Sequence, residues 1–188
     1  FTCSISDFFH KQADPWREEA WNIILKTPQH TYQILTKRPG LMVAWAEKHG
    51  WPEHVWAGTS VESQKYAPRL DVLARVPAKV RFVSVEPMLG PVDLVPYFFK
   101  CSGTCVPTEE NPQCACKGLA INWAIAGGES GSHARPMAPD WARSLRNQCQ
   151  AAGVPYFLKQ LGGLRAGGPA LLDGREWREF PCDPLTGA

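Results

Sequence analysis

Residues 80–87 read VRFVSVEP, and this stretch decides the fold that we expect. A short run of β-branched and aromatic residues is typical of a buried strand, and this run ends abruptly in a carboxylate, Glu86, followed by Pro87. The same pattern of an apolar run that ends in polar residues recurs along the chain. The other runs cover residues 1–6, 31–35, 55–61, 121–126 and 154–158.

Helical patterns lie between these runs. Asp14 and Pro15 predict a helix start with Asp14 as the cap, and Trp16, Ala20 and Ile24 then fall on one face with Trp21 beside them. Further helices are expected to open near Leu41, Pro68 and Pro139. Strands that alternate with helices predict an α/β fold with a parallel sheet. A full barrel needs about 250 residues, so we expect an incomplete TIM-like (β/α) barrel of about six parallel strands.

Two segments depart from this pattern and set the expected domain limits. Residues 1–161 are predicted to form the partial barrel, with an inserted Cys-rich loop at residues 99–118. Residues 162–188 are predicted to form a C-terminal tail or a hairpin around Asp173 and Gly174. The sequence opens inside an expected strand and without Met, so we expect further residues upstream in the natural protein.

Composition excludes some classes of function and leaves others open. The formal net charge is +2 over 188 residues, which gives no global electrostatic argument for a nucleic-acid or membrane partner. No apolar run is long enough to span a bilayer, and seven cysteines do not suit a secreted disulfide scaffold. We therefore expect a cytoplasmic protein. The sequence contains no GxSxG, P-loop or GxGxxG motif, and its five His residues lack metal-ligand spacing.

Ligands of β/α folds bind beyond the carboxyl ends of the strands, so the polar residues there are the candidates for a site. The candidate catalytic residues are Glu62, Glu86 and Lys37. The candidate cofactor-binding residues are Ser6, Asp7, Ser60, Ser84, Gly127, Gly128, Glu129, Arg135 and Lys159. A purely structural alternative is that these residues cap helices or form internal ion pairs, such as Lys37 with Glu62 or Glu86.

The segment at residues 127–131, GGESG, is the sharpest local signal in this set. Glycines after a strand allow a ligand to approach the backbone, although a tight turn explains them equally well. Arg135 either folds over the same site to bind an anion or lies in solvent. Because three carboxylates meet two lysines on one rim, we expect at least one Lys–Glu pair and at least one glutamate left for a ligand.

A separate cluster of thiols lies in the inserted loop. Its ligand set is Cys101, Cys105, Cys114 and Cys116. Four thiolates suit tetrahedral zinc, but Cys-x-Cys is a less typical spacing than Cys-x2-Cys. Structural zinc, disulfides, free thiols and an iron–sulfur cluster therefore all remain open. Cys149 is expected to be a buried apolar residue.

Six ordered motifs carry a resemblance over nearly the whole chain outside the Cys-rich loop. They are SISDFFH at 4–10, LTKRP at 35–39, GTSVE at 58–62, RFVSVEPMLG at 81–90, GGESG at 127–131 with ARP at 134–136, and FLKQ at 157–160. The sequence resembles the uncharacterised phage family named after gene products 37 and 68, which looks like a branch of the radical S-adenosylmethionine (SAM) barrels. That resemblance implies a barrel, SAM and a 4Fe–4S cluster held by an upstream three-cysteine loop. This chain has no such loop, so either it is a fragment or the cluster is absent.

The resemblance also implies roles for the rim residues. Ser6 and Asp7 would hold the amino acid part of SAM, and the nucleoside side would meet Gly127, Gly128 and Glu129. Ser60, Glu62, Ser84 and Glu86 would line the cavity.

Two rival hypotheses remain. One is a non-redox β/α enzyme that acts on a phosphorylated substrate, with Lys37, Arg135 and Lys159 as anion clamps. The other is a phage-encoded, zinc-stapled module that binds nucleic acid or protein. The substrate and the oligomeric state do not follow from the sequence.

Overall fold

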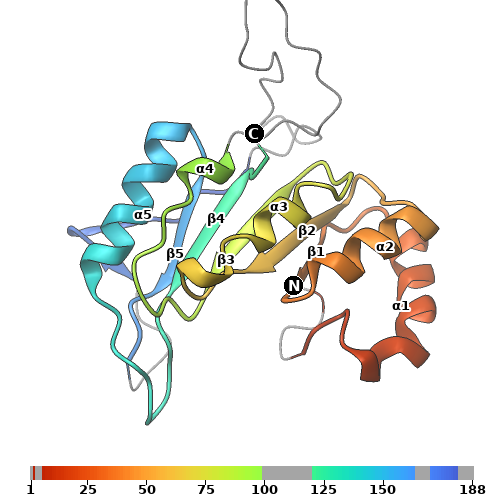
Figure 1. Ribbon diagram of the computed structural model, residues 1–188, viewed down its shortest axis with the longest axis horizontal. Coiled ribbons are helices and arrows are strands. Elements are labelled where there is room, and N and C mark those ends of the chain that lie inside the picture. The colour runs from red at the N-terminus through yellow and green to blue at the C-terminus, as the bar shows by residue number, and fades with distance from the viewer. Residues whose placement is uncertain (1, 3–5, 99–119, 164–169, 182–188) are drawn as a thin grey trace, which may run out of the picture.

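The computed structural model describes residues 2, 6–98, 120–163 and 170–181 of the chain. Five parallel strands form one sheet in the order β1-β2-β3-β4-β5 (Figure 1). Their bounds are β1 (Tyr32–Thr36), β2 (Val55–Ser60), β3 (Arg81–Val85), β4 (Trp123–Gly127) and β5 (Tyr156–Gln160). Neighbouring strands are also consecutive in sequence, so each crossover returns the chain to the adjacent position. The predicted α/β class, with strands alternating with helices, is confirmed.

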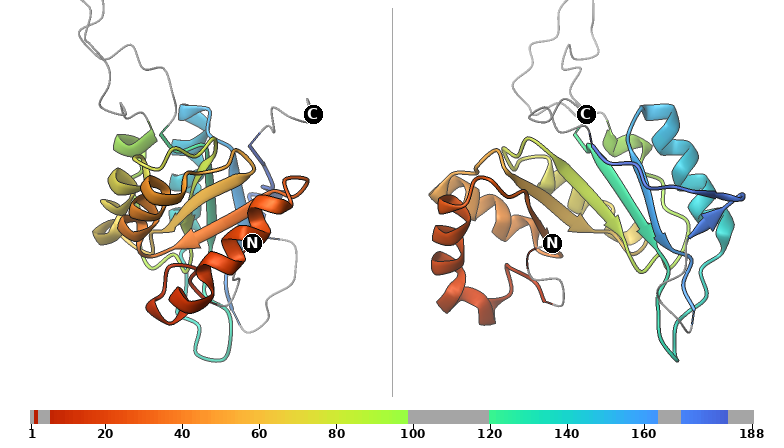
Figure 2. Two further views of the ribbon diagram at one scale, coloured as in Figure 1. Left: turned by 90° about the vertical axis from the view of Figure 1, so that its right-hand side faces the viewer. Right: turned by 180° about the vertical axis from the view of Figure 1, so that it is seen from behind.

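The helices between the strands supply the apolar surface that covers one face of the sheet. In Figure 1, α2, α3 and α5 lie in front of it, and Figure 2 shows the sheet from behind. The helices are α1 (Asp14–Lys26), α2 (Pro39–His49), α3 (Arg69–Leu73), α4 (Val95–Phe98) and α5 (Pro139–Ala152), with 3-10 turns η1 (Lys11–Ala13) and η2 (Gln64–Tyr66). No helix in the described part of the chain is long and apolar enough to cross a bilayer.

Both edges of the sheet are extended by short pieces of chain. Beyond β1, Thr2 forms a parallel bridge with Ile34. Of the strand expected at residues 1–6 only Thr2 and Ser6 are described, and Ser6 lies in a bend and not in a strand. Beyond β5, residues 177–179 run antiparallel: the Leu158 N–H donates to the Trp177 carbonyl, and the Glu179 N–H donates to the Tyr156 carbonyl. The predicted C-terminal tail therefore docks against the sheet. The sixth strand and the closure into a barrel remain predictions.

The sheet is apolar on both faces. The helix-covered face carries the main core, including Ile34, Val83 and Tyr156. The second face carries a cluster centred on Trp56, Phe82 and Trp123, with Trp56 and Trp123 edge to face at 5.9 Å between ring centroids. We call it the aromatic face. Continuous apolar strands are explained by this double burial.

The predicted face of α1 is only partly buried, and the predicted helix cap is wrong. Ile24 and the neighbouring Trp21 are buried, but Trp16 on the same face as Ile24 is 64% exposed. Asp14 was expected to cap the helix, but the turn η1 enters α1 directly and Ala13 occupies the cap position. The Asp14 carboxylate instead pairs with Arg17 at 2.6 Å, one turn along the helix.

The hairpin expected around Asp173 and Gly174 is confirmed. Strands β6 (Leu171–Leu172) and β7 (Arg175–Glu176) pair antiparallel. The two turn residues have φ of 57° and 75°, as a two-residue hairpin loop of this type requires.

Gly58 tests the packing of the aromatic face. A Cβ at Gly58 would lie 2.2 Å from Cζ of the buried Phe82 ring, so Gly58→Ala should lower the free energy of unfolding by about 1–3 kcal/mol. In α2, nothing lies within 4 Å of a Cβ at Gly40, so Gly40→Ala should be neutral or stabilising by up to about 1 kcal/mol. Urea unfolding of both variants measures the difference, and equal effects would contradict this account of the face.

Candidate functional site

The register of the sheet brings the polar residues at the carboxyl ends of the strands together at one end of the sheet. Ser60 of β2 lies opposite Ser84 of β3, two residues beyond the aligned pair Gly58 and Phe82. Side chains two residues apart point to the same face, so hydroxyl groups sit directly above the aromatic face. The next layer holds the charged residues that end or follow the strands. We call this set the carboxyl rim: Lys37, Glu62, Glu86, Glu129 and Lys159.

Glu62 is the most buried carboxylate of the rim, with 7% of the residue exposed. Lys37 Nζ lies 2.5 Å from one carboxylate oxygen, and a guanidinium nitrogen of Arg69 lies 2.9 Å from the other. Burial acts to raise the pKa of Glu62, but the hydrogen bond and charge of Lys37 and the charge of Arg69 outweigh it and lower the pKa. Glu62 is therefore held ionised between two cations.

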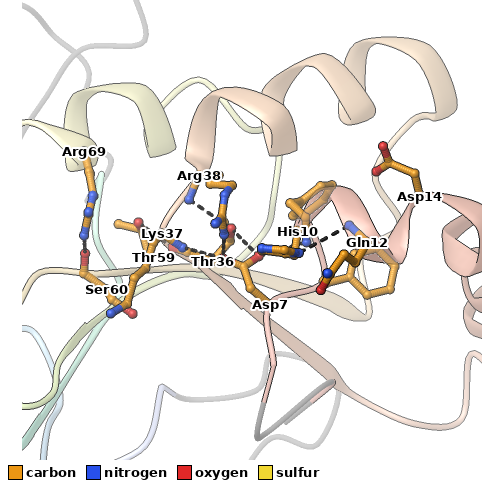
Figure 3. A network of polar contacts seen from close by, with 12 residues as sticks. Asp7, His10, Gln12, Asp14, Thr36, Lys37, Arg38, Thr59, Ser60 and Arg69 are labelled. Carbon is orange, nitrogen blue, oxygen red and sulfur yellow. Dashed lines mark hydrogen bonds and ion pairs between the residues drawn. The ribbon is translucent and has the colours of Figure 1, made fainter.

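Arg69 belongs to this site although its sequence context did not indicate it. It lies at the start of α3 and also donates to the Ser60 carbonyl at 2.7 Å, as Figure 3 shows. Arg69 in addition lies over the Tyr66 ring, with its guanidinium carbon 4.3 Å from the centroid. A basic residue in a short helix carries no local signal that it reaches back to a strand end, so only the fold reveals this contact.

Glu86 is held more loosely than Glu62. Its carboxylate lies 3.4 Å from Lys159 Nζ and accepts a hydrogen bond from the Ser84 hydroxyl at 3.1 Å. The Glu86 side chain is 18% exposed and that of Lys159 is 58% exposed. An exposed lysine at this distance contributes little to stability. The Glu86 carboxylate is thus mostly buried and has one largely exposed cation beside it.

Close packing explains the glycine pair at the end of β4, Gly127 and Gly128. A Cβ at Gly127 would lie 2.4 Å from Oε1 of Glu86, so the absence of a side chain creates the space that the carboxylate occupies. A Cβ at Gly128 would lie 2.5 Å from the Leu161 carbonyl, where the loops after β4 and β5 run side by side. Neither a tight turn nor the approach of a ligand is needed to explain Gly127, because a side chain there would displace the Glu86 carboxylate.

Glu129 and Arg135 form an ion pair across one loop. Arg135 donates to the Glu129 carboxylate from Nε at 2.8 Å, from Nη2 at 2.9 Å and from its backbone N–H at 3.0 Å. These hydrogen bonds and the positive charge of Arg135 lower the pKa of Glu129 to about 2. One alternative had Arg135 folding over the site to bind an anion. The anion that it binds is the carboxylate of Glu129, and this contact closes the loop between residues 129 and 135.

Asp7 connects the N-terminal loop to the end of β1. One carboxylate oxygen accepts from the Phe9 N–H at 2.8 Å and the Thr36 hydroxyl at 2.7 Å. The other accepts from the Lys37 N–H at 3.1 Å and from Arg38 at 2.7 Å (Figure 3). Burial acts to raise the pKa of Asp7, but these hydrogen bonds and the Arg38 charge prevail and lower it. Both oxygens are engaged, which makes Asp7 a structural wall of the site.

The structure tests the expected charge pairing directly. Lys37–Glu62 and Lys159–Glu86 confirm the prediction of at least one Lys–Glu pair on the rim. Glu62, Glu86 and Glu129 each have a basic partner, so the expectation that one glutamate is left to meet a ligand stays a prediction. A pocket of about 380 Å³ nevertheless opens at the β1 and β2 end of the rim. It is lined by Ser6, Asp7, Leu35, Thr36, Lys37, Arg38 and Ser60.

The expected zinc ligands, Cys101, Cys105, Cys114 and Cys116, lie outside the described residues. Within the described ranges, no three His, Cys, Asp or Glu side chains are grouped to hold a metal ion. Cys149 is fully buried in α5, as expected, and burial raises the pKa of its thiol to about 12. It is an apolar core residue without nucleophilic character at neutral pH.

The chain is therefore a β/α protein in which the carboxylates at the carboxyl ends of the strands are each paired with a lysine or an arginine. The chain belongs to an uncharacterised family described as "Protein of unknown function (DUF5131)", whose model matches residues 1–181. No curated protein and no solved structure matches the chain. The family description carries no activity, so the phage and radical-SAM parts of the resemblance stay proposals.

Acid should lower the free energy of unfolding, because Asp7 and Glu62 are ionised in the folded protein. The pKa values of Asp7 and Glu62 are lowered in the folded state, so their stabilisation is present above the ordinary carboxyl pKa of about 4 and is lost as pH falls through the lowered values. Glu62→Gln should lower the free energy of unfolding at neutral pH and flatten its fall on acidification. Urea unfolding at neutral pH and at about pH 3 measures both effects.

The matched control for this measurement is Glu53→Gln. Glu53 precedes β2 at the opposite edge of the sheet and pairs with Lys79 at 3.7 Å, but its side chain is 79% exposed. Its loss should change stability by no more than about 1 kcal/mol. An unchanged pH dependence in Glu62→Gln would show that Glu62 is not coupled to the two cations.

Proposed function

We propose that this chain is part of a radical-SAM-like enzyme of phage or prophage origin, active in the cytoplasm, and that SAM binds at the carboxyl rim. The observation that carries the proposal is Glu86. It is a mostly buried carboxylate above an aromatic face, and its ion-pair partner, Lys159, is exposed and 3.4 Å away. A cationic ligand can displace such a lysine without leaving a buried charge unpaired.

SAM suits this arrangement because it carries a sulfonium and an ammonium group beside a carboxylate. The two cationic groups complement Glu86, and the displaced Lys159 remains near enough to meet the carboxylate of the ligand. Ser60 and Ser84 supply hydroxyl groups on the same face of the sheet. Asp7, whose oxygens are already engaged, contributes as a wall rather than as a direct ligand of the amino acid part.

The redox partner in this proposal is a 4Fe–4S cluster, which supplies the electron that starts radical chemistry on SAM. In this proposal its cysteines belong to the upstream three-cysteine loop that the resemblance implies and that these 188 residues do not contain. The residues of this chain would bind SAM, orient it and exclude water. The substrate from which hydrogen is taken is not assigned.

The alternative of a non-redox enzyme on a phosphorylated substrate is less well supported. Its three proposed anion clamps, Lys37, Arg135 and Lys159, each have a glutamate within salt-bridge distance. A phosphate would have to compete with those carboxylates and would meet their negative charge. For Arg135 the competing contact is a two-pronged hydrogen-bonded pair, which is the least readily displaced.

Replacing Glu86 tests the proposal. Glu86→Gln keeps the shape and the Ser84 contact but removes the charge, so it should weaken SAM binding about tenfold or more. Binding is measured by isothermal titration calorimetry on the cluster-reconstituted natural protein. Gly127→Ala should weaken it as well, because the added methyl group displaces the Glu86 carboxylate.

Glu53→Gln is the control for this experiment, since it removes the same charge at the opposite edge of the sheet. It should leave the affinity for SAM unchanged. Circular dichroism and urea unfolding would show that the variants keep their fold. Equal SAM affinity in the parent protein and in Glu86→Gln would remove Glu86 from the site and, with it, the basis of this proposal.

The third reading, a zinc-stapled binding module, depends on Cys101, Cys105, Cys114 and Cys116, and we retain it as a proposal for that loop alone. If all four thiolates hold zinc, elemental analysis should find about one zinc per chain. Replacing Cys114 and Cys116 together with Ser should abolish it, whereas Cys149→Ser should not. Protein free of zinc after purification in zinc-supplemented buffer would rule out the site.

A further inference from the structure

A second pocket lies on the other side of Asp7 from the rim pocket. Its volume is about 520 Å³, and its exposed walls are mainly apolar. It is formed where the loop that carries Asp7 and Phe8 meets the first half of α1. Its lining residues are Ser6, Asp7, Phe8, His10, Gln12, Ala13, Trp16, Arg17 and Ala20. We call it the α1 pocket.

The walls of the α1 pocket are rigidly built. Arg17 donates from Nε to the Phe8 carbonyl at 2.9 Å and from Nη2 to the His10 carbonyl at 3.0 Å, so the helix holds the loop from one side. Asp7 fastens the same loop to β1 from the other side. Arg17 is itself held by Asp14 at 2.6 Å. A loop tied at both ends keeps its pocket open at little further entropic cost on binding.

Trp16 is a large aromatic residue that takes no part in the hydrophobic core. It lines the α1 pocket and is 64% exposed, although Trp21 in the same helix is 2% exposed. Indole is a large flat surface on which a planar ring can stack. An exposed Trp on a preformed, mostly apolar pocket is therefore suited to a flat aromatic ligand.

Polar groups at the edge of the pocket narrow the ligand class. Nδ1 of His10 accepts a hydrogen bond from the Gln12 N–H at 3.2 Å, so the proton of the neutral ring is on Nε2, which makes that atom a donor. The exposed Gln12 carboxamide offers both a donor and an acceptor. Figure 3 shows His10 and Gln12 next to each other beyond Asp7. Adjacent donors and acceptors around a stacking surface match the edge of a nucleobase and not that of a plain hydrocarbon ring.

We propose that the α1 pocket is a binding site for a nucleobase, stacked on Trp16 and read at its edge by His10 and Gln12. It is separate from the SAM position proposed at Glu86, and Asp7 is the wall between the α1 pocket and the rim pocket. The base can belong to a free nucleoside or to single-stranded nucleic acid, because both present the same ring and the same edge.

The test uses adenosine, guanosine, cytidine and uridine as probes, with binding to the full chain measured by calorimetry and by saturation-transfer NMR. At least one nucleoside should bind, and Trp16→Ala should weaken it about tenfold or more. Gln12→Ala should change the order of preference among the four bases. Ile23→Ala is the matched control, because Ile23 is 55% exposed on the same helix but does not line the pocket.

Three results would overturn the proposal. They are the absence of any nucleoside binding tighter than about 1 mM, an equal loss of affinity in Trp16→Ala and Ile23→Ala, and equal binding of benzyl alcohol and nucleosides. Short single-stranded oligonucleotides, compared with the matching nucleoside, separate the two sources of the base.

A further arm separates this site from the proposed SAM site. Glu86→Gln should leave nucleoside affinity unchanged, and Trp16→Ala should leave SAM affinity unchanged. If Trp16→Ala weakens SAM as much as it weakens adenosine, the pocket holds the adenine of SAM and the second site is refuted. Failure of SAM to bind at Glu86 leaves the nucleoside result standing, because the two measurements use different residues.

Discussion

Parallel pairing directs the end of every strand of this sheet to the same edge, and charged residues follow there directly on buried runs. Carboxylates and ammonium groups placed so close to an apolar layer are costly unless each meets an opposite charge. Glu62 is buried and is compensated by two cations, Lys37 and Arg69. Glu129 is more exposed and is compensated by Arg135. The geometry of the site follows from this need for local compensation.

The same constraint makes Glu86 distinctive. Glu62 has two cations at short distances, whereas Glu86 has one exposed lysine and a hydroxyl group. The position of Glu86 depends on a glycine in the neighbouring strand, since any side chain at Gly127 would occupy the same space. A carboxylate that has a space prepared for it but only one exposed cation beside it is suited to exchange that cation for a ligand, which is why the proposed function rests on it.

The N-terminal loop extends this logic beyond the sheet. Asp7 is used up in joining the loop to β1, and Arg17 holds the loop to α1, so neither group is free for chemistry. Ser6 and Asp7 line both the α1 pocket and the rim pocket, so the hydrogen-bonded loop lies between the two. Asp7 thereby separates the α1 pocket, where we propose that a nucleobase binds, from the rim pocket.

Much of the fold follows from local patterns in the sequence. Apolar runs such as residues 80–85 predicted the strands β1 to β5, and the Asp173–Gly174 turn predicted the hairpin, because strand propensity and turn chemistry act over a few residues. The carboxyl rim was also predictable, since parallel topology alone places the polar strand ends at the same end of the sheet. A Lys–Glu pair on the carboxyl rim followed from charge balance, with Glu62 and Glu86 both open as partners of Lys37.

Other features were decided only by the tertiary structure. The helical period correctly grouped Trp16 with Ile24, but which part of that face meets the core depends on how α1 is docked, and Trp16 faces out. Arg69 reaches Glu62 from another element, Gly127 makes room for Glu86 of the adjacent strand, and Asp7 bonds to residues about thirty positions away. The sequence by itself determined which residues form strands and where their charges gather. The tertiary structure decided which charges pair and which pockets stay open, because those outcomes depend on distances between segments that local patterns do not encode.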